Sequence, residues 1–299
     1  MGSGSKKREQ VLKNKPENVN DKGVVEQVPI NPLEELLACL GSPSWQVRKD
    51  SSEKLAAFGE KIVSHLIRSL NSVNEDQRFW ALVTLCRIDT EKALKPVLKL
   101  TTVKDAGIRG HAAIALGYSR HMDSSQQLIN LLNDPDWRVC NHAVNSLVMH
   151  GSSVIDNLIE ALKSASYNAA FWITKALSRM GDDGIEVLIA FSRFKSKNIR
   201  MLVSEALCES ENQKAVQTLL SLLKDEHWMV RQNAVDSLIR MGGKVIEPLI
   251  FFMRNEKENM IPFVEKVFSG LGEHRITPLV SLLQQEDREI RVLAADALG

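Results

Sequence analysis

Cysteine is the side chain here that most readily binds metal or acts as a nucleophile, and the sequence has four. A zinc site needs its ligands close together, usually with two of them in a Cys-x-x-Cys motif. Cys39, Cys86, Cys140 and Cys208 lie far apart, and none belongs to such a motif. We therefore predict that they are small buried hydrophobic residues. Unpaired cysteines also suit a reducing compartment, so we expect a cytoplasmic protein.

Motifs for catalysis and cofactor binding are missing from the sequence as well. It contains no Gly-x-Ser-x-Gly nucleophile motif, no His-Glu-x-x-His zinc motif and no glycine-rich phosphate-binding loop. No pair of carboxylates has the pattern typical of acid–base catalysis. We therefore predict that the protein is not an enzyme, has no catalytic, metal or cofactor site, and uses no evident small-molecule substrate.

The overall composition argues against several other classes of protein. The 299 residues include 38 Lys and Arg against 37 Asp and Glu, a net charge of +1 that favours neither nucleic acid nor an anionic membrane. We expect no membrane span and no secretory leader, because long apolar runs are missing. Aromatic residues are only 5%, which is low for a β-barrel and typical of a helical protein.

From Pro32 onward the sequence repeats itself every 30 or 31 residues. In each repeat an anchor residue is followed four positions later by a mostly small residue and eight positions later by Leu or Phe. These positions share one helix face, and a Gly twelve residues after the anchor in five repeats predicts a helix end. A second apolar segment precedes each of these helices. The anchors are Val47, Gln77, Ile108, Val139, Ala169, Ile199, Val230, Met260 and Ile290.

One pair of antiparallel helices cannot bury its apolar face alone, so the repeats must stack. We predict an all-α fold, a right-handed α-solenoid of nine two-helix repeats over residues 32–299. Residues 1–31 have few large apolar residues and no helical period, so we expect them to be disordered or extended. Because the ninth repeat stops at Gly299, we expect truncation within or just after it, with association through that end as the alternative.

The turns and second helices resemble the HEAT-repeat family in its short form, known from bilin-lyase-like proteins. The resemblance lies in DPDWRV at Asp134–Val139 and DEHWMVR at Asp225–Arg231, and the repeat pattern extends over residues 32–299. It implies the solenoid fold and says little about function. The aspartate six residues before the Arg matches only at Asp134 and Asp225, so we do not expect a continuous Asp–Arg ladder.

An arginine follows the anchor in six repeats and could in principle track phosphates. The arginine lies at the edge of the buried face of the second helix. This position favours a structural role instead, in which the arginine caps backbone carbonyls or pairs with acidic side chains. His111 and His142 occupy the same position in adjacent repeats. Their helices lie roughly 10 Å apart, which is too far for the two side chains to bind one metal ion. We therefore expect them to be surface histidines. The arginines are Arg48, Arg78, Arg109, Arg200, Arg231 and Arg291.

Aromatic residues stand two positions before the anchor in four repeats, at the expected start of the second helix. We prefer the interpretation that they form hydrophobic staples onto the first helix. The alternative is an aromatic ledge that docks a partner, since Trp and Tyr are common interface anchors. These residues are Trp45, Trp137, Tyr167 and Trp228.

A second set of apolar residues occupies positions that should face the concave side of the solenoid. Exposed apolar clusters on such a surface mark binding sites, with an extended peptide or helix as the natural ligand. Burial between tightly packed helices is the equally weighted alternative. The set comprises Phe79, Val83, Cys86, Ile114, Phe171 and Met201.

We therefore predict a non-catalytic scaffold or adaptor that binds another protein or peptide on its concave surface. The resemblance leaves as an alternative a bilin-lyase-like or chaperone-type enzyme subunit acting on a client protein, although no cation-lined pocket is evident. A nucleic-acid-binding module is less favoured because a basic face is missing. The predicted partner-binding residues are Phe79, Val83, Ile114, Phe171, Met201, Trp45, Trp137, Tyr167 and Trp228.

Overall fold

A computed structural model describes residues 32–255 and 261–299 of the protein. These residues form α-helices, short turns and 3-10 turns, and no strand occurs among them. The predicted N-terminal segment, residues 1–31, lies outside the described residues. The first helices of the repeats are α1 (Pro32–Cys39), α3 (Val63–Ser69), α5 (Glu91–Leu100), α7 (Met122–Leu131), α9 (Ile155–Ser164), α11 (Gly181–Phe191), α13 (Gln213–Leu222), α15 (Ile246–Asn255) and α17 (Ile276–Leu282).

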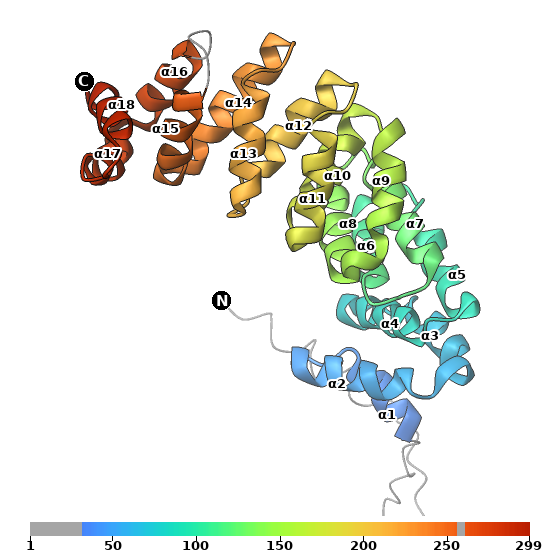
Figure 1. Cartoon of the computed structure of the whole chain (residues 1–299). Coiled ribbons are helices and arrows are strands. Elements are labelled where there is room, and N and C mark those ends of the chain that lie inside the picture. Colours follow the sequence, from blue (N-terminus) through green and yellow to red (C-terminus); the bar gives the residue numbers. More distant parts are fainter. Residues whose placement is uncertain (1–31, 256–260) are drawn as a thin grey trace, which may run out of the picture.

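Each first helix is followed by a longer or similar second helix, and the pairs stack into one curved array (Figure 1). The second helices contact one another far more extensively along the array than the first helices do. Their layer is therefore the shorter one, and it lines the inner side of the arc. The second helices are α2 (Trp45–Ala56), α4 (Glu75–Ile88), α6 (Ala106–Leu116), α8 (Trp137–His150), α10 (Tyr167–Ser178), α12 (Lys197–Leu207), α14 (Trp228–Met241), α16 (Ile261–Leu271) and α18 (Arg288–Leu298).

Small residues allow the second helices to pack closely. The residue four positions after the anchor is buried in all nine repeats, and α6 and α8 are in especially extensive contact. A Cβ atom on Gly110 would lie 3.1 Å from Cδ2 of His142, and one on Gly117 would lie 2.8 Å from Oγ of Ser146. Gly110 on α6 and Gly117 at its end therefore let α8 approach closely.

Left-handed residues end the second helices, as the glycine column predicts. Gly59, Gly151, Gly181 and Gly242 have φ of 63°, 66°, 67° and 72°, a region that other residues seldom adopt. Asp89 takes the same place in the second repeat with φ of 57°. Its carboxylate accepts hydrogen bonds from the Ser119 hydroxyl and, at 3.1 Å, from the backbone N–H of Arg120, which ties it to the third repeat.

The anchor column is less uniformly buried than its repetition predicts. It is buried in most of the later repeats, for example at Val139 and Val230, but Ala169 is half-buried and Val47 and Ile108 are exposed. In the repeats whose anchor the structure describes, the anchor is the third residue of the second helix and therefore lies close to the turn. Met260 lies outside the described residues. None of the described helices is both long and apolar enough to cross a membrane.

Candidate functional site

The arginine column holds the two helices of each repeat together. In all six repeats that carry it, Nη1 donates to two successive backbone carbonyls in the turn before the second helix. Arg109 reaches the oxygens of Val103 and Lys104 at 2.9 and 2.8 Å. These hydrogen bonds confirm the structural role predicted for the column.

Three of these arginines also join neighbouring repeats: Arg48 lies 3.2 Å from Asp76 of the second repeat, and two others form bidentate pairs. Arg109 binds Asp134 of the next repeat through two hydrogen bonds of 2.7 and 2.8 Å, and the carboxylate raises the pKa of the guanidinium. Arg200 binds Asp225 in the same way at 2.7 and 2.9 Å. The bidentate ladder is limited to the repeats where the sequence places the aspartate. In the fourth repeat Cys140 replaces the arginine.

The four aromatic residues at the helix starts are exposed, so the hydrophobic-staple interpretation is wrong. Trp45, Trp137, Tyr167 and Trp228 are 58%, 66%, 58% and 63% exposed, and each is the first residue of its second helix. A staple is not needed to hold most of these helix starts, because a side chain caps them instead. The Asp136 carboxylate accepts from the N–H of Arg138 at 2.9 Å, for example.

The apolar residues predicted for the concave face divide into two groups. Val83 and Cys86 are fully buried, so placing them on the surface is wrong. In α4 both the neighbouring second helices and the adjoining first helices cover this part of the chain, which leaves residues 80–86 buried. The other members are half-buried and present part of their side chains to solvent: Phe79, Ile114, Phe171 and Met201.

Aromatic contacts hold two of these half-buried residues in place. Phe79 packs edge-on against Trp80, with ring centroids 5.8 Å apart, and against His111 at 5.5 Å. Phe171 packs in the same way against Trp172 at 5.1 Å. Among the residues that the structure describes, no group of three or more His, Cys, Asp or Glu side chains could hold a metal ion.

Burial lowers the reactivity of the buried cysteine thiols. Cys86, Cys140 and Cys208 are buried and Cys39 is half-buried, and desolvation raises the pKa of Cys140 to about 11. One contact that no sequence motif indicates joins His150 and Ser125, which lie 25 residues apart and place Nδ1 3.0 Å from Oγ.

This histidine–serine pair is structural. The Nε2 atom of His150 lies 3.2 Å from the carbonyl oxygen of Leu116, so it donates inward and Nδ1 is the acceptor. Both side chains are buried, and burial lowers the pKa of His150. The serine is therefore not an accessible nucleophile.

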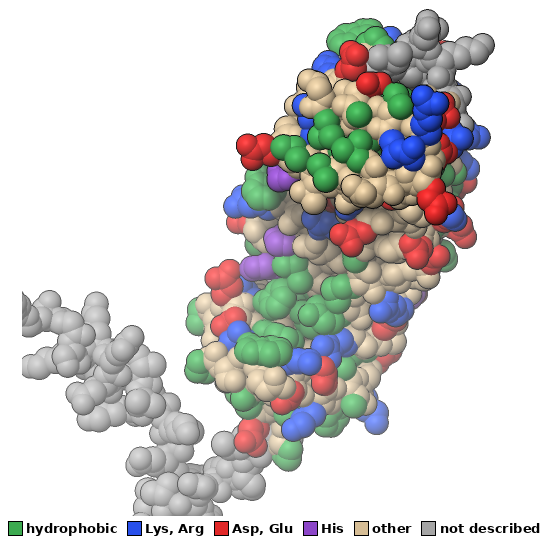
Figure 2. All heavy atoms as spheres, turned by 60° about the vertical axis from the view of Figure 1, so that its left-hand side comes forward, with side chains coloured by type: hydrophobic (Ala, Val, Ile, Leu, Met, Phe, Trp, Pro, Cys, Tyr) green, Lys and Arg blue, Asp and Glu red, His purple; other side chains and the backbone are tan. Residues whose placement is uncertain are grey.

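The exposed aromatics border the concave face and form one surface with it. We call the turns before α8, α10, α12 and α14, together with the first residues of those helices, the turn edge. Tyr167 and Phe171 lie one helical turn apart on α10, which connects the turn edge with the inner face. Figure 2 shows hydrophobic side chains gathered in patches, with both charge signs scattered among them.

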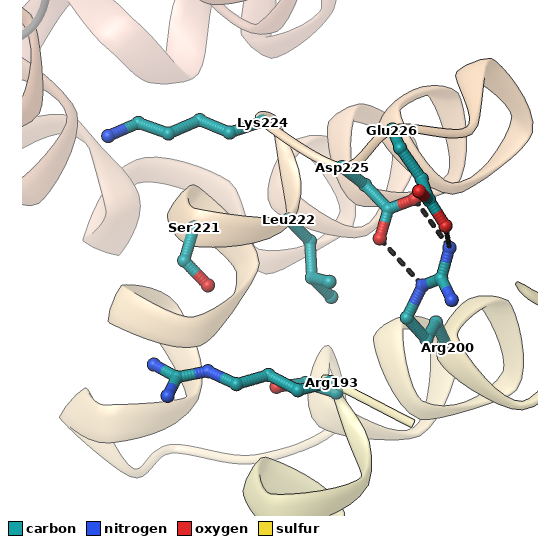
Figure 3. A pocket seen from close by; sticks show the side chains of 8 residues that line it. Arg193, Arg200, Ser221, Leu222, Lys224, Asp225 and Glu226 are labelled. Carbon is teal, nitrogen blue, oxygen red and sulfur yellow. Dashed lines mark hydrogen bonds and ion pairs between the residues drawn. The ribbon is translucent and has the colours of Figure 1, made fainter. Parts of the chain in front are cut away.

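Three hollows lie along the turn edge, one between each pair of neighbouring repeats from the fourth to the seventh. The first, about 360 Å³, is lined by Trp137 and Phe171, and the second, about 210 Å³, by Tyr167 and Phe194. The third, about 390 Å³, is lined by charged and polar side chains that include Arg193 (Figure 3). This surface therefore offers apolar contacts and charge side by side.

Comparison with known proteins places these repeats in a family. HEAT repeats match residues 33–117, 104–178 and 185–260, which together are most of the chain. No curated protein matches the sequence.

Several solved structures resemble the array loosely. A chain of the complex of CpcE and CpcF of phycocyanin lyase from Nostoc is 21% identical, with a TM-score of 0.33, and the match covers 79% of this chain and 94% of that chain. Human deoxyhypusine hydroxylase is 15% identical, with a TM-score of 0.30, over 89% of this chain and 94% of that chain. The assignment rests on the repeats themselves, and the chain belongs to the HEAT-repeat family.

Proposed function

We propose that this HEAT-repeat protein is a non-catalytic scaffold that binds another protein along its turn edge and the adjoining concave face. The observation that carries the proposal is the exposure of Trp137, Tyr167 and Trp228 on the turn edge, with Trp45 exposed at the equivalent position of α2. Trp and Tyr bury large areas on binding and dominate the energetics of protein interfaces.

The placement of these aromatics favours tight binding. Each is fixed to the first turn of a helix whose backbone is held by packing and, in most cases, by a side-chain cap, so little backbone order is lost on binding. The half-buried Phe171 continues the apolar surface toward the inner face. The capped starts of α8, α10 and α14 do not need these aromatics to hold the helix end.

Photo-crosslinking tests this proposal in the cell that makes the protein. A photoreactive phenylalanine analogue would replace Trp137 or Tyr167 on the turn edge, or Met122 as the control. Met122 is also a large exposed apolar residue at a helix start, but it belongs to a first helix, α7.

We expect a discrete protein adduct from the Trp137 and Tyr167 positions and none from Met122. Adducts that form equally well from Met122, or from that position alone, would show that the turn edge is not the binding surface. Absence of a protein adduct from every position would contradict a scaffold role.

A further inference from the structure

A cleft of about 140 Å³ lies on the second-helix layer, on the inner side of the arc. Its lining comes from α10, α12 and α14, which follow one another along the array (Figure 1). Phe171, Leu202 and Ala206 supply apolar lining. Four charged side chains line it as well, and we call this feature the inner cleft. They are Lys175, Glu205, Glu209 and Arg240.

The charges of the inner cleft alternate in sign from helix to helix. Glu205 and Glu209 lie one helical turn apart on α12, where like charges repel and slightly destabilise a helix. Lys175 on α10 and Arg240 on α14 flank them. Among the residues that the structure describes, none of these four forms an ion pair. Lys175 lies over the Phe171 ring at 5.9 Å, a contact that leaves its positive charge in place.

The equivalent residues of the first two repeats do form an ion pair. Glu53 and Glu205 both lie six residues after the anchor, and Arg87 and Arg240 both lie ten residues after it. Arg87 binds Glu53 at 2.9 Å across α4 and α2. The repeat geometry therefore allows this pair, yet Glu205 and Arg240 line the inner cleft without forming it. Both charges thus remain available to a partner.

The spacing of the second helices favours a helical ligand. Neighbouring second helices lie roughly 10 Å apart. An extended chain covers this distance in about three residues, and side chains three residues apart point to opposite faces. A helix covers it in about seven residues at about 1.5 Å each. Seven residues are nearly two full turns, so a helix presents the same face to each second helix that it crosses.

We propose, on the basis of the scaffold function above, that the partner lays an amphipathic helix along the inner side of the arc, across α10, α12 and α14. Its face presents an acidic, a basic and an acidic side chain at intervals of about seven residues. The basic side chain, an arginine, enters the inner cleft between Glu205 and Glu209. The acidic side chains bind Lys175 and Arg240. A nucleic acid fits less well, because the two glutamates repel a phosphate backbone.

The other charges near the inner cleft are consistent with this order. Arg179 lies one turn after Lys175 and adds positive charge to α10, although its Nη1 donates to α8 at 3.1 Å. Asp236 lies one turn before Arg240, but it is not part of the cleft lining and accepts a hydrogen bond from Gln232 at 2.8 Å.

The test measures binding of synthetic peptides to the full chain by fluorescence anisotropy. The matched peptide is an alanine-rich helix of about twenty residues with Glu, Arg and Glu at seven-residue intervals and leucines on the same face. The inverted peptide has Arg, Glu and Arg at these positions, and an acidic peptide has three Glu. Each charge pattern reads the same in both directions, so a reversed orientation cannot turn one peptide into another.

The charge-reversal variant combines Glu205→Lys with Glu209→Lys. The matched control combines Asp156→Lys with Glu160→Lys, an exposed acidic pair of the same spacing on α9 in the layer of first helices, and changes the net charge by the same amount. A milder variant, Glu205→Gln with Glu209→Gln, removes the charges and keeps the side-chain size. Circular dichroism and thermal unfolding check that each variant folds.

We expect the matched peptide to bind about tenfold more tightly than the inverted peptide. The charge-reversal variant should raise the Kd of the matched peptide by about tenfold or more, and the α9 control by less than about twofold. The same variant should bind the acidic peptide more tightly than the unaltered chain does. The glutamine variant should weaken the matched peptide without lowering the Tm, because the repulsion within α12 is removed.

The proposal fails if matched and inverted peptides bind equally, or if the α9 control weakens binding as much as charge reversal on α12. A lower Tm of the glutamine variant would also overturn it, since the carboxylates would then serve the fold. Self-association that charge reversal abolishes, measured by light scattering, would assign the inner cleft to a second copy of the chain. If photo-crosslinked adducts form from Trp137 and Tyr167 while no peptide binds, the scaffold function stands and only the helical partner is wrong.

Discussion

The packed layer of second helices and the turn edge use the same residue types in opposite ways. Trp172 is buried against Phe171 in the layer, whereas Trp137 is exposed at the edge. Arg109 is buried and bonded to Asp134, whereas Arg193 is exposed beside a hollow. The comparison shows that neighbouring atoms, and not residue type, decide whether a side chain stabilises the fold or remains available for a partner.

Removing an arginine from each region gives the largest expected difference. Arg109→Ala leaves the carboxylate of Asp134 buried without its partner, since the Asp134 side chain is only 5% exposed. We expect the free energy of unfolding to fall by about 3–5 kcal/mol. Arg193→Ala should change it by less than about 0.5 kcal/mol. Urea unfolding followed by circular dichroism measures both changes.

A double variant sharpens this prediction. Arg109→Ala combined with Asp134→Ala removes both members of the pair, so we expect it to be more stable than Arg109→Ala alone. If the two variants are equally stable, the ion pair is not the source of the loss.

The two tryptophans give a similar comparison without charge. Trp172→Ala removes a large buried side chain and leaves a cavity, which typically lowers the free energy of unfolding by about 3–5 kcal/mol. Because Trp172 is 9% exposed, we expect the lower part of this range. Trp137→Ala should cost less than about 0.5 kcal/mol but abolish the photo-crosslinked adduct from Tyr167. Thermal unfolding of the two variants checks the first part. Equal losses of stability would mean that Trp137 is part of the core.

The smallest expected effect is on the pH dependence of stability, and it concerns only the buried layer, where His150 lies. Burial lowers the pKa of His150, so the folded protein resists protonation while the unfolded chain accepts a proton near the ordinary histidine value of about 6.5. The free energy of unfolding should therefore fall as the pH drops from about 7 to about 5. We expect a shallower decline in His150→Gln, and identical slopes would show that this histidine does not contribute.

The periodic columns made the fold predictable. The second helices, their glycine ends and the arginine caps each repeat at the same spacing, so several independent positions identify each element. Asp89 escaped prediction because it adopts the left-handed conformation without being glycine, and its support comes from Ser119 in the next repeat.

The site was less predictable because the exposure of a side chain depends on residues of neighbouring helices, which the spacing within one repeat does not reveal. Trp45, Trp137, Tyr167 and Trp228 have the pattern of staples, and only the structure shows that they remain exposed. Val83 has the phase of a surface residue, but the helices around α4 cover it. The hollow at Arg193 combines side chains from two repeats, and no local motif joins them.

The nearly constant repeat length has a consequence for how such a chain can change during evolution. Gain or loss of one whole repeat at a turn preserves the register of every remaining helix, because each repeat contacts mainly its neighbours. A single inserted residue within a second helix would instead rotate everything after it by about 100° and turn the buried Ala and Leu columns outward. Lengthening by complete modules is therefore tolerated, whereas small insertions are confined to the turns, where the proposed binding surface lies.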